Sequence, residues 1–211
     1  MTVEGFLKSF DNVVRRNDAD DRKVRGDEFL LTDGYARGFD LLFRRYRGAV
    51  KGWISYSFLK SVRRSRGGRT FPSEQDRRHS LEVVLQAPGP AGSALTVRWG
   101  YGSPLPYTGI VGEWFHREYN AVTHSFDRFE IEPLSSTVNG ARFPYYSRLD
   151  LGLRWQFERF GGIWRPYLLL VNAYNRRNVF QYTFDFASAP PARSGTSQLP
   201  FLPTVGLEFE W

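Results

Sequence analysis

The stretch Pro203-Thr-Val-Gly-Leu-Glu-Phe-Glu-Trp211 decides the fold class. Its large apolar side chains occupy every second position: Val205, Leu207, Phe209 and Trp211. A side-chain period of two is typical of a β-strand with one apolar and one polar face. A strand that ends on a large aromatic fits a closed barrel, whose last strand pairs and leaves no free edge. It fits a strand that completes a soluble sheet as well, so this stretch alone leaves both interpretations open.

The same alternation recurs along the chain. The clearest alternating segments are 39–43, 50–58, 81–85, 95–101, 149–157 and 180–186, and residues 164–171 form a further strand whose alternation is blurred. A weaker pattern covers residues 3–10, a loop is expected over 11–28, and the irregular segment 105–145 is expected to hold a short extra strand pair. No helical period is present. We therefore predict an all-β chain of about nine strands in an antiparallel meander, forming part of a larger transmembrane β-barrel.

Composition excludes several classes of function. The 211 residues are 17% aromatic and include no cysteine, so disulfides and thiolate metal sites are absent. The histidines His79, His116 and His124 are scattered, and no nucleophile, base and orienting residue appear together. We expect no metal, no cofactor and no enzymatic activity.

The net charge of +7 raises the question of nucleic-acid binding, because nearly all of the 29 basic residues are Arg. These residues are interleaved with Asp and Glu, and no nucleic-acid-binding signature accompanies them. The Arg cluster at 63–78 lies in a glycine-containing connector that is explained equally well by a solvated loop or by one facing lipopolysaccharide. We therefore expect no nucleic-acid partner.

Alternation alone does not say which face points inward. A soluble sandwich buries the apolar face, whereas a membrane barrel turns it toward lipid and keeps the polar face in the lumen. Several segments reach the ~9–11 residues that cross a bilayer when tilted, and aromatics gather toward segment ends. Charges also occupy the polar faces, at Asp40, Arg98, Arg148, Asp150 and Arg154. These features favour the barrel.

The charged residues of the polar faces are candidates for the lumen wall. Inward-pointing Arg98, Arg148 and Arg154 would form a positive wall that favours anionic solutes. The competing expectation is that each arginine pairs with a carboxylate, with Asp40, Asp150 and Glu158 as candidate partners.

Several motifs, in order, resemble the C-terminal part of a TonB-dependent outer-membrane receptor. They are Gly34–Arg45, Gly48–Ser57, Phe71–His79, Arg142–Asp150, Tyr167–Asn178 and Leu199–Trp211. Each is weak alone, but their order and their end at the terminal strand make the resemblance specific. The chain departs from the family at Pro104–Thr108, which lacks a preceding Gly, at Ala173, and at Asp40, where Glu is common.

The resemblance implies that residues 1–211 are the C-terminal segment of a receptor barrel in the outer membrane. The function it implies is energy-coupled uptake of a scarce nutrient, such as a ferric siderophore, as a small-molecule or chelate ligand. The family's plug domain, which binds the TonB-type energy coupler, and a signal peptide are both expected to lie outside this sequence. The alternative is a self-contained small barrel or sandwich that binds a ligand or a surface.

The resemblance also implies two features of the barrel wall. Val205, Leu207, Phe209 and Trp211 would contact outer-membrane lipid and be read by the barrel insertion machinery. With the C-terminus at the periplasmic end, we count each expected strand after residue 145 as one crossing of the membrane. These four strands, 149–157, 164–171, 180–186 and the terminal strand, place the connector 105–145 at the periplasmic end as well. Long connectors of such barrels normally face outward, so the count and the expected orientation disagree.

Overall fold

The computed structural model describes residues 1–16, 29–65, 68–186, 188 and 192–211. Its main feature is a ten-stranded sheet in the order β1-β2-β3-β5-β6-β11-β13-β12, in which β16 also pairs with β13 and β4 with β3. The long strands of this sheet are β1 (Thr2–Arg16), β2 (Phe29–Arg45), β3 (Lys51–Ser65), β5 (His79–Pro88), β6 (Ala94–Gly102), β11 (Tyr146–Arg154), β13 (Gly162–Val171) and β16 (Leu202–Glu210). The short ones are β4 (Thr70–Pro72) and β12 (Phe157–Arg159).

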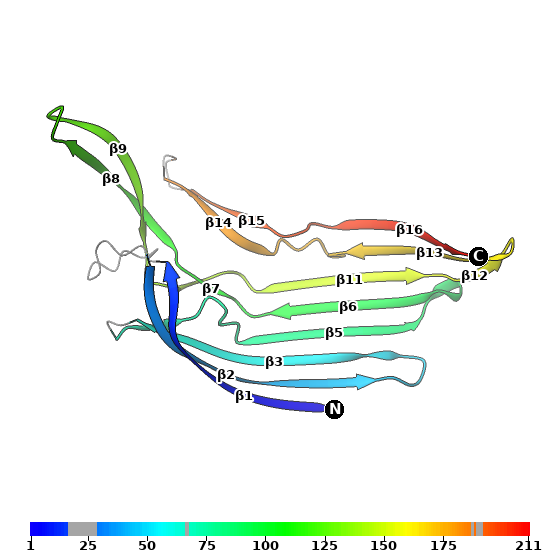
Figure 1. Cartoon of the computed structure of the whole chain (residues 1–211). Helices are drawn as coiled ribbons and strands as arrows, with labels where there is room; N and C mark the ends of the chain where they lie inside the picture. The colour runs from blue at the N-terminus through cyan, green and yellow to red at the C-terminus, as the bar shows by residue number, and fades with distance from the viewer. Residues whose placement is uncertain (17–28, 66–67, 187, 189–191) are drawn as a thin grey trace.

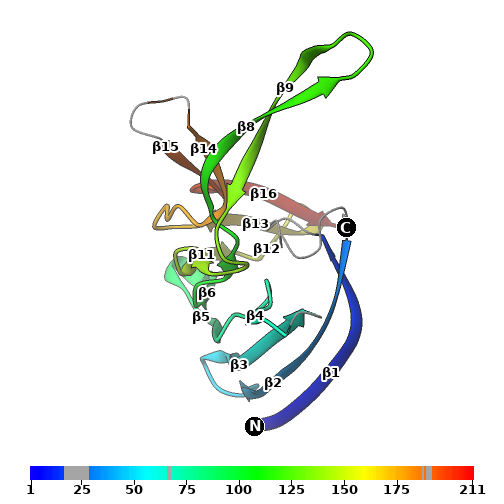
Figure 2. The same ribbon diagram turned by 90° about the vertical axis from the view of Figure 1, so that its left-hand side faces the viewer.

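The predicted all-β antiparallel meander is confirmed. Every strand pair is antiparallel, and neighbours in the sheet follow the chain except where hairpins are inserted between them. Figure 1 shows the long strands side by side, and Figure 2 shows that the sheet bends into an open arc with β4 on its inner side. In the described chain β1 pairs only with β2 and β16 only with β13, so the arc does not close on itself.

Two hairpins extend from one end of the sheet. One consists of β8 (Ile110–Asn120) and β9 (Ser125–Ser135), and the other of β14 (Val179–Asp185) and β15 (Ala192–Ser197). The extra strand pair expected within 105–145 is therefore present, and it is long rather than short. At its base the two-residue strands β7 (Pro106–Tyr107) and β10 (Ala141–Arg142) also pair.

The second hairpin corrects the predicted strand count. Residues 180–186 were expected to cross the membrane as a separate strand, but β14 pairs with β15 and lies outside the main sheet. In Figure 1 the chain runs from β13 into β14 and returns through β15 into β16, at the end opposite the C-terminus. Without this false crossing, an odd number of long strands separates the 105–145 connector from the C-terminus. The connector therefore lies at the end of the sheet opposite the C-terminus, as Figure 1 shows. The count that put these two at one end therefore included one crossing too many, which resolves its disagreement with the expected orientation.

The first strand is also longer than its pattern suggests. β1 pairs with β2 from Thr2 to Arg16, with a register shift between Phe10 and Val13. Asn12 has a φ of 56° at this irregularity, which explains why the alternation is lost there. The loop expected from residue 11 therefore does not begin before residue 17, and residues 17–28 lie outside the described chain.

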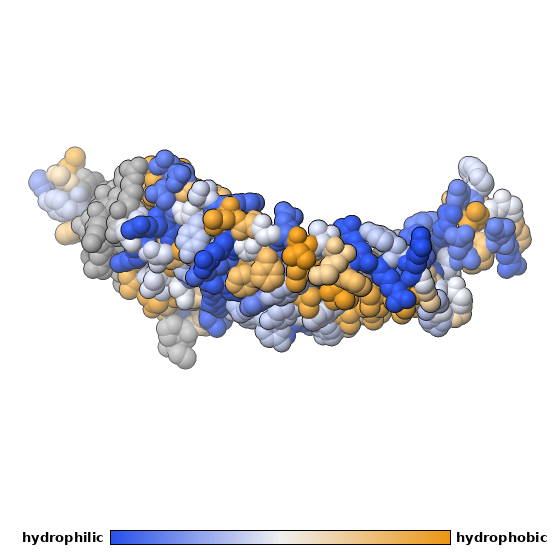
Figure 3. Space-filling view, turned by 90° about the horizontal axis from the view of Figure 1, so that it is seen from below, coloured by the Kyte–Doolittle hydropathy of each residue, from blue (hydrophilic) through white to orange (hydrophobic). Residues whose placement is uncertain are grey.

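The described chain has almost no hydrophobic core. Its buried hydrophobic residues are Leu30, Ala36, Phe71 and Val138. In the described chain the main sheet is a single curved layer (Figure 2). Figure 3 shows hydrophobic surface along the length of the sheet, interrupted by hydrophilic patches. The sheet's apolar side chains are therefore exposed rather than packed in a sandwich.

Candidate functional site

The strand register places the predicted lumen charges on one face of the main sheet. Directly paired residues of antiparallel strands point to the same side. Asp40 pairs with Ser57 on β3, and Ser57 with Ser80 on β5. Continuing across β6, the same face carries the residues Gly102, Gly100, Arg98, Arg148, Asp150 and Arg154. We call this surface the polar face.

The arginines of the polar face are neutralised by carboxylates. Arg98 pairs with Glu82 at 2.6 Å, and Arg148 with Asp150 at 2.8 Å. Arg154 pairs with Glu208 at 3.0 Å rather than with Glu158. The three arginines therefore do not form an unbalanced positive wall. Asp40 lies opposite Glu4 on β1 and forms no ion pair with any described residue.

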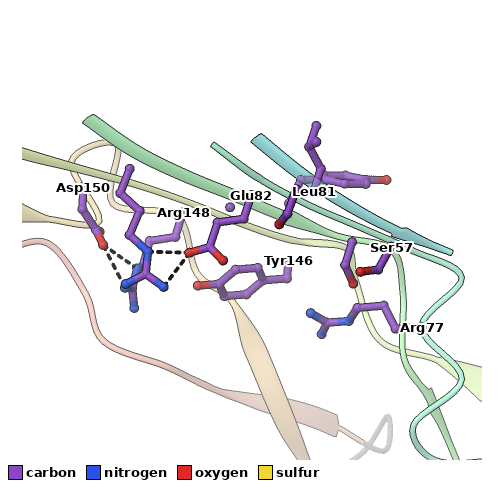
Figure 4. Close-up of a pocket in the computed structure, with 12 residues that line it drawn as sticks. Ser57, Arg77, Leu81, Glu82, Tyr146, Arg148 and Asp150 are labelled. Atoms are coloured by element: carbon purple, nitrogen blue, oxygen red, sulfur yellow. Dashed lines mark hydrogen bonds and ion pairs between the residues drawn. The ribbon is translucent and has the colours of Figure 1, made fainter. Parts of the chain in front are cut away.

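A pocket of about 300 Å³ opens on the polar face over β3, β5, β6 and β11. Figure 4 shows its lining, in which two ion pairs lie at one end and Arg77 at the other. The hydroxyl side chains of Ser55, Ser57, Ser80 and Tyr146 also line the pocket. None of these four hydroxyls forms a hydrogen bond to another described residue. The pocket thus combines an unused cation with unused hydroxyl donors.

Arg77 differs from the other arginines of the pocket. It lies in the loop between β4 and β5, and its guanidinium covers Gly102 so closely that a Cβ there would meet it. Its Nε is buried without a hydrogen-bond partner, and its guanidinium carbon lies 5.7 Å from the ring centroid of Tyr146. No carboxylate in the described chain forms an ion pair with it. Burial lowers the pKa of Arg77 from its ordinary value, and Tyr146 opposes this with a smaller effect.

The buried Asp76 carboxylate fixes the loop that carries Arg77. Asp76 is 0% exposed and accepts hydrogen bonds from the Ser61 backbone N–H at 2.7 Å and from Arg78 Nε at 2.9 Å. Arg142 Nη2 donates to the same carboxylate at 3.1 Å. Asp76 therefore joins β3, its own loop and β10. The neighbouring Arg77 is held over the sheet because the loop around it is held.

Asp150 has a comparable structural role at the next connector. Its Oδ1 accepts a hydrogen bond from the backbone N–H of Asn172 at 2.9 Å, while its Oδ2 pairs with Arg148. Asn172 is 0% exposed, has a φ of 53°, and donates through Nδ2 to the carbonyls of Arg176 and Leu199. Asp150 thus anchors the turn between β13 and β14. Asn suits this position because its short polar side chain tolerates the left-handed backbone conformation.

The predicted membrane-insertion residues lie on the face opposite the pocket. Val205 pairs with Leu168, Leu207 with Pro166 and Phe209 with Trp164, all from the apolar sets of β16 and β13. Their exposed fractions are 77% for Val205, 55% for Leu207, 45% for Phe209 and 96% for Trp211. The rings of Trp164 and Phe209 are in contact, with centroids 4.6 Å apart. These four apolar side chains of β16 are therefore largely exposed in the described chain.

Sequence reasoning missed Arg77, Glu82 and Glu208. Residues 76–79 entered the analysis only as part of a connector motif, and Arg77 was grouped with the solvated arginines of that connector. Glu82 and Glu208 occupy polar positions of alternating strands, so their place on the polar face was predictable. Their pairing with Arg98 and Arg154 follows from the register, which alternation does not provide.

The described residues contain no cluster of three or more His, Asp and Glu side chains that could hold a metal ion. No helix in that part of the chain has the length and hydrophobicity to span a membrane. No protein-family model, no curated protein and no solved structure matches this chain.

Proposed function

We propose that this chain is part of the barrel wall of a TonB-dependent outer-membrane receptor, as its ordered motifs suggest. The receptor would take up a scarce nutrient, such as a ferric siderophore, with energy from the inner membrane. The observation that carries this proposal is a one-layer curved sheet with an uncovered apolar face and a charged, hydroxyl-rich opposite face.

The energetics of that sheet support a lipid environment. Large side chains such as Trp211 and Val205 are 96% and 77% exposed, and burying each in an apolar environment is worth about 1.5–3 kcal/mol. A bilayer supplies that environment along the whole apolar face at once. The polar face then borders the lumen, where Arg98, Arg148 and Arg154 stay hydrated in their ion pairs.

The arrangement of connectors also supports the proposal. The tight connections at 46–50, 89–93 and 160–161 lie at the end of the sheet that holds the C-terminus (Figure 1). The long hairpins β8–β9 and β14–β15 extend from the other end. Outer-membrane barrels have short periplasmic turns and long extracellular loops. The expected orientation of such a barrel therefore agrees with this distribution.

The proposal is tested by the location and activity of the full-length protein that carries this sequence. We expect it in the outer-membrane fraction after density-gradient separation, resistant to extraction by alkaline carbonate. Cells that produce it should accumulate an iron chelate, and a protonophore should abolish that uptake. Recovery of the protein in the soluble fraction would contradict the membrane assignment. Uptake that is insensitive to the protonophore would contradict energy coupling.

The terminal strand offers a sharper mutational test. Trp211→Asp places a charge on the apolar face, and we expect roughly half or less of the wild-type amount in the outer membrane. Thr204→Asp introduces the same charge on the polar face of the same strand and should insert at the wild-type level. Equal insertion of the two variants would contradict a lipid-facing role for Trp211. The measurement is the amount of protein with heat-modifiable gel mobility.

A further inference from the structure

We propose that the Arg77 pocket binds an oxyanion, a carboxylate or phosphate group of a small solute. The inference rests on the proposed function in one respect, because the polar face must border water for a solute to reach it. It adds to that function a defined binding subsite and the chemistry of the group that it recognises.

The first argument is charge balance within the pocket. Its lining includes Arg98 and Arg148, but Glu82 and Asp150 neutralise them at 2.6 Å and 2.8 Å. After this pairing, one charge is left over. It belongs to Arg77, which forms no ion pair in the described chain. The lining of the pocket therefore has a net charge of one positive unit, that of Arg77, and a bound anion would neutralise it.

The second argument is the desolvation of Arg77. Its guanidinium is partly buried, and its Nε has no hydrogen-bond partner. Among the described residues, the Tyr146 ring offers it a weak attraction. A desolvated cation without a partner is unfavourable, whereas a charge-assisted hydrogen bond to an oxyanion is among the stronger polar interactions in proteins. The planar guanidinium also matches the paired oxygens of a carboxylate or phosphate.

The third argument is the set of hydroxyls around that cation. Ser55, Ser57, Ser80 and Tyr146 line the same pocket, and none of their hydroxyls bonds to another described residue. A hydroxyl donates readily to an anionic oxygen. The volume of about 300 Å³ accommodates a small organic anion.

The loop geometry indicates that the site is built rather than accidental. Asp76 holds the loop through three donors, and Gly102 leaves the space in which the guanidinium lies. A side chain at position 102 would displace Arg77 from the pocket. The loop that carries Arg77 is therefore fixed, and the absence of a side chain at position 102 leaves room for the guanidinium.

The test is isothermal titration calorimetry of the purified full-length protein in detergent at low ionic strength. The probes are citrate, inorganic phosphate and, as an uncharged comparison, glycerol. We expect citrate, phosphate or both to bind and glycerol not to bind. Binding of citrate alone identifies a carboxylate, and binding of phosphate alone a phosphate group. Absence of binding by both anions would overturn the inference.

Two pairs of variants separate the pocket from general charge effects. Arg77→Gln should weaken anion binding about ten-fold or more, because a charge-assisted hydrogen bond is lost. Arg165→Gln removes the same charge from the polar face outside the pocket, where Arg165 pairs with Glu210, and should bind like the wild type. Equal losses in both variants would overturn the inference.

The second pair changes geometry without changing charge. Gly102→Ala should displace the flexible Arg77 side chain and weaken binding, while the fold is retained. Gly152→Ala lies on the same face, where the added Cβ makes only ordinary contacts, and should bind like the wild type. Wild-type affinity in Gly102→Ala and Arg77→Gln together would overturn the inference. Since calorimetry does not depend on membrane location, its outcome is independent of the fractionation test above.

Discussion

Single buried polar residues hold the connectors of this molecule in place. Asp76 and Asn172 are both 0% exposed, and each joins segments that are distant in sequence. In a chain whose described part buries few hydrophobic residues, such polar anchors replace a core at the ends of the strands. A buried group that loses its partner costs more than the bond itself contributes, so these positions are expected to be sensitive.

Asp76→Ala tests this role. The substitution leaves the Ser61 N–H without its acceptor and removes the shared partner of Arg78 and Arg142. We expect a loss of about 3 kcal/mol in the free energy of unfolding, measured by urea titration in detergent micelles. Glu74→Ala removes an exposed carboxylate from the same loop and should change stability by less than about 0.5 kcal/mol. A similar loss in both variants would show that Asp76 is not an anchor.

At the scale of the element, alternation identified β6, β11 and β16 because each has one apolar and one polar face throughout. It failed at β14, whose residues alternate equally well although the strand lies outside the main sheet. Alternating apolar and polar side chains indicate that the two faces of a strand lie in different environments. They do not indicate which sheet contains the strand. It also failed after Phe10, where an irregularity in β1 breaks the period without ending the strand.

Gly38 permits a close approach of β2 and β3. A Cβ built at Gly38 would meet the backbone carbonyl of Phe58 and lie 2.8 Å from Phe6 Cζ, so β2 and β3 approach closely there. Gly38→Ala should therefore separate the two strands and cost about 1–3 kcal/mol of unfolding free energy. The measurement is the same urea titration.

Gly5→Ala is the matched control for that prediction. Gly5 lies on the neighbouring strand β1, and its added Cβ would approach no described atom closer than the Gly38 carbonyl at 4.0 Å. We expect it to leave stability unchanged or slightly raised, because Ala restricts the unfolded chain. If Gly38→Ala is tolerated as well as Gly5→Ala, the close approach of β2 and β3 is not needed for folding.

At the scale of the whole molecule, the two faces of the sheet define its environment. The polar-face positions of Asp40, Arg98, Arg148, Asp150 and Arg154 were predictable, since each belongs to the polar set of its strand and the polar sets share one side of the sheet. The pocket was not predictable, because Arg77 reaches it from a loop whose path depends on Asp76 and Gly102. Sites built by loops that fold over a sheet leave no periodic signal in the sequence.

The most direct test of this account is the environment of alternate residues along one strand. These 211 residues contain no cysteine, so only cysteines elsewhere in the full-length protein would first be replaced by serine. Single cysteines are then placed at neighbouring positions of β6, at Val97 on the apolar face and at Thr96 on the polar face. Each would carry a fluorophore in the full-length protein, reconstituted in vesicles that contain nitroxide-labelled lipid. The account predicts strong quenching by lipid at position 97 and weak quenching at position 96. Equal quenching at the two positions, or none at either, would contradict a lipid-facing apolar surface.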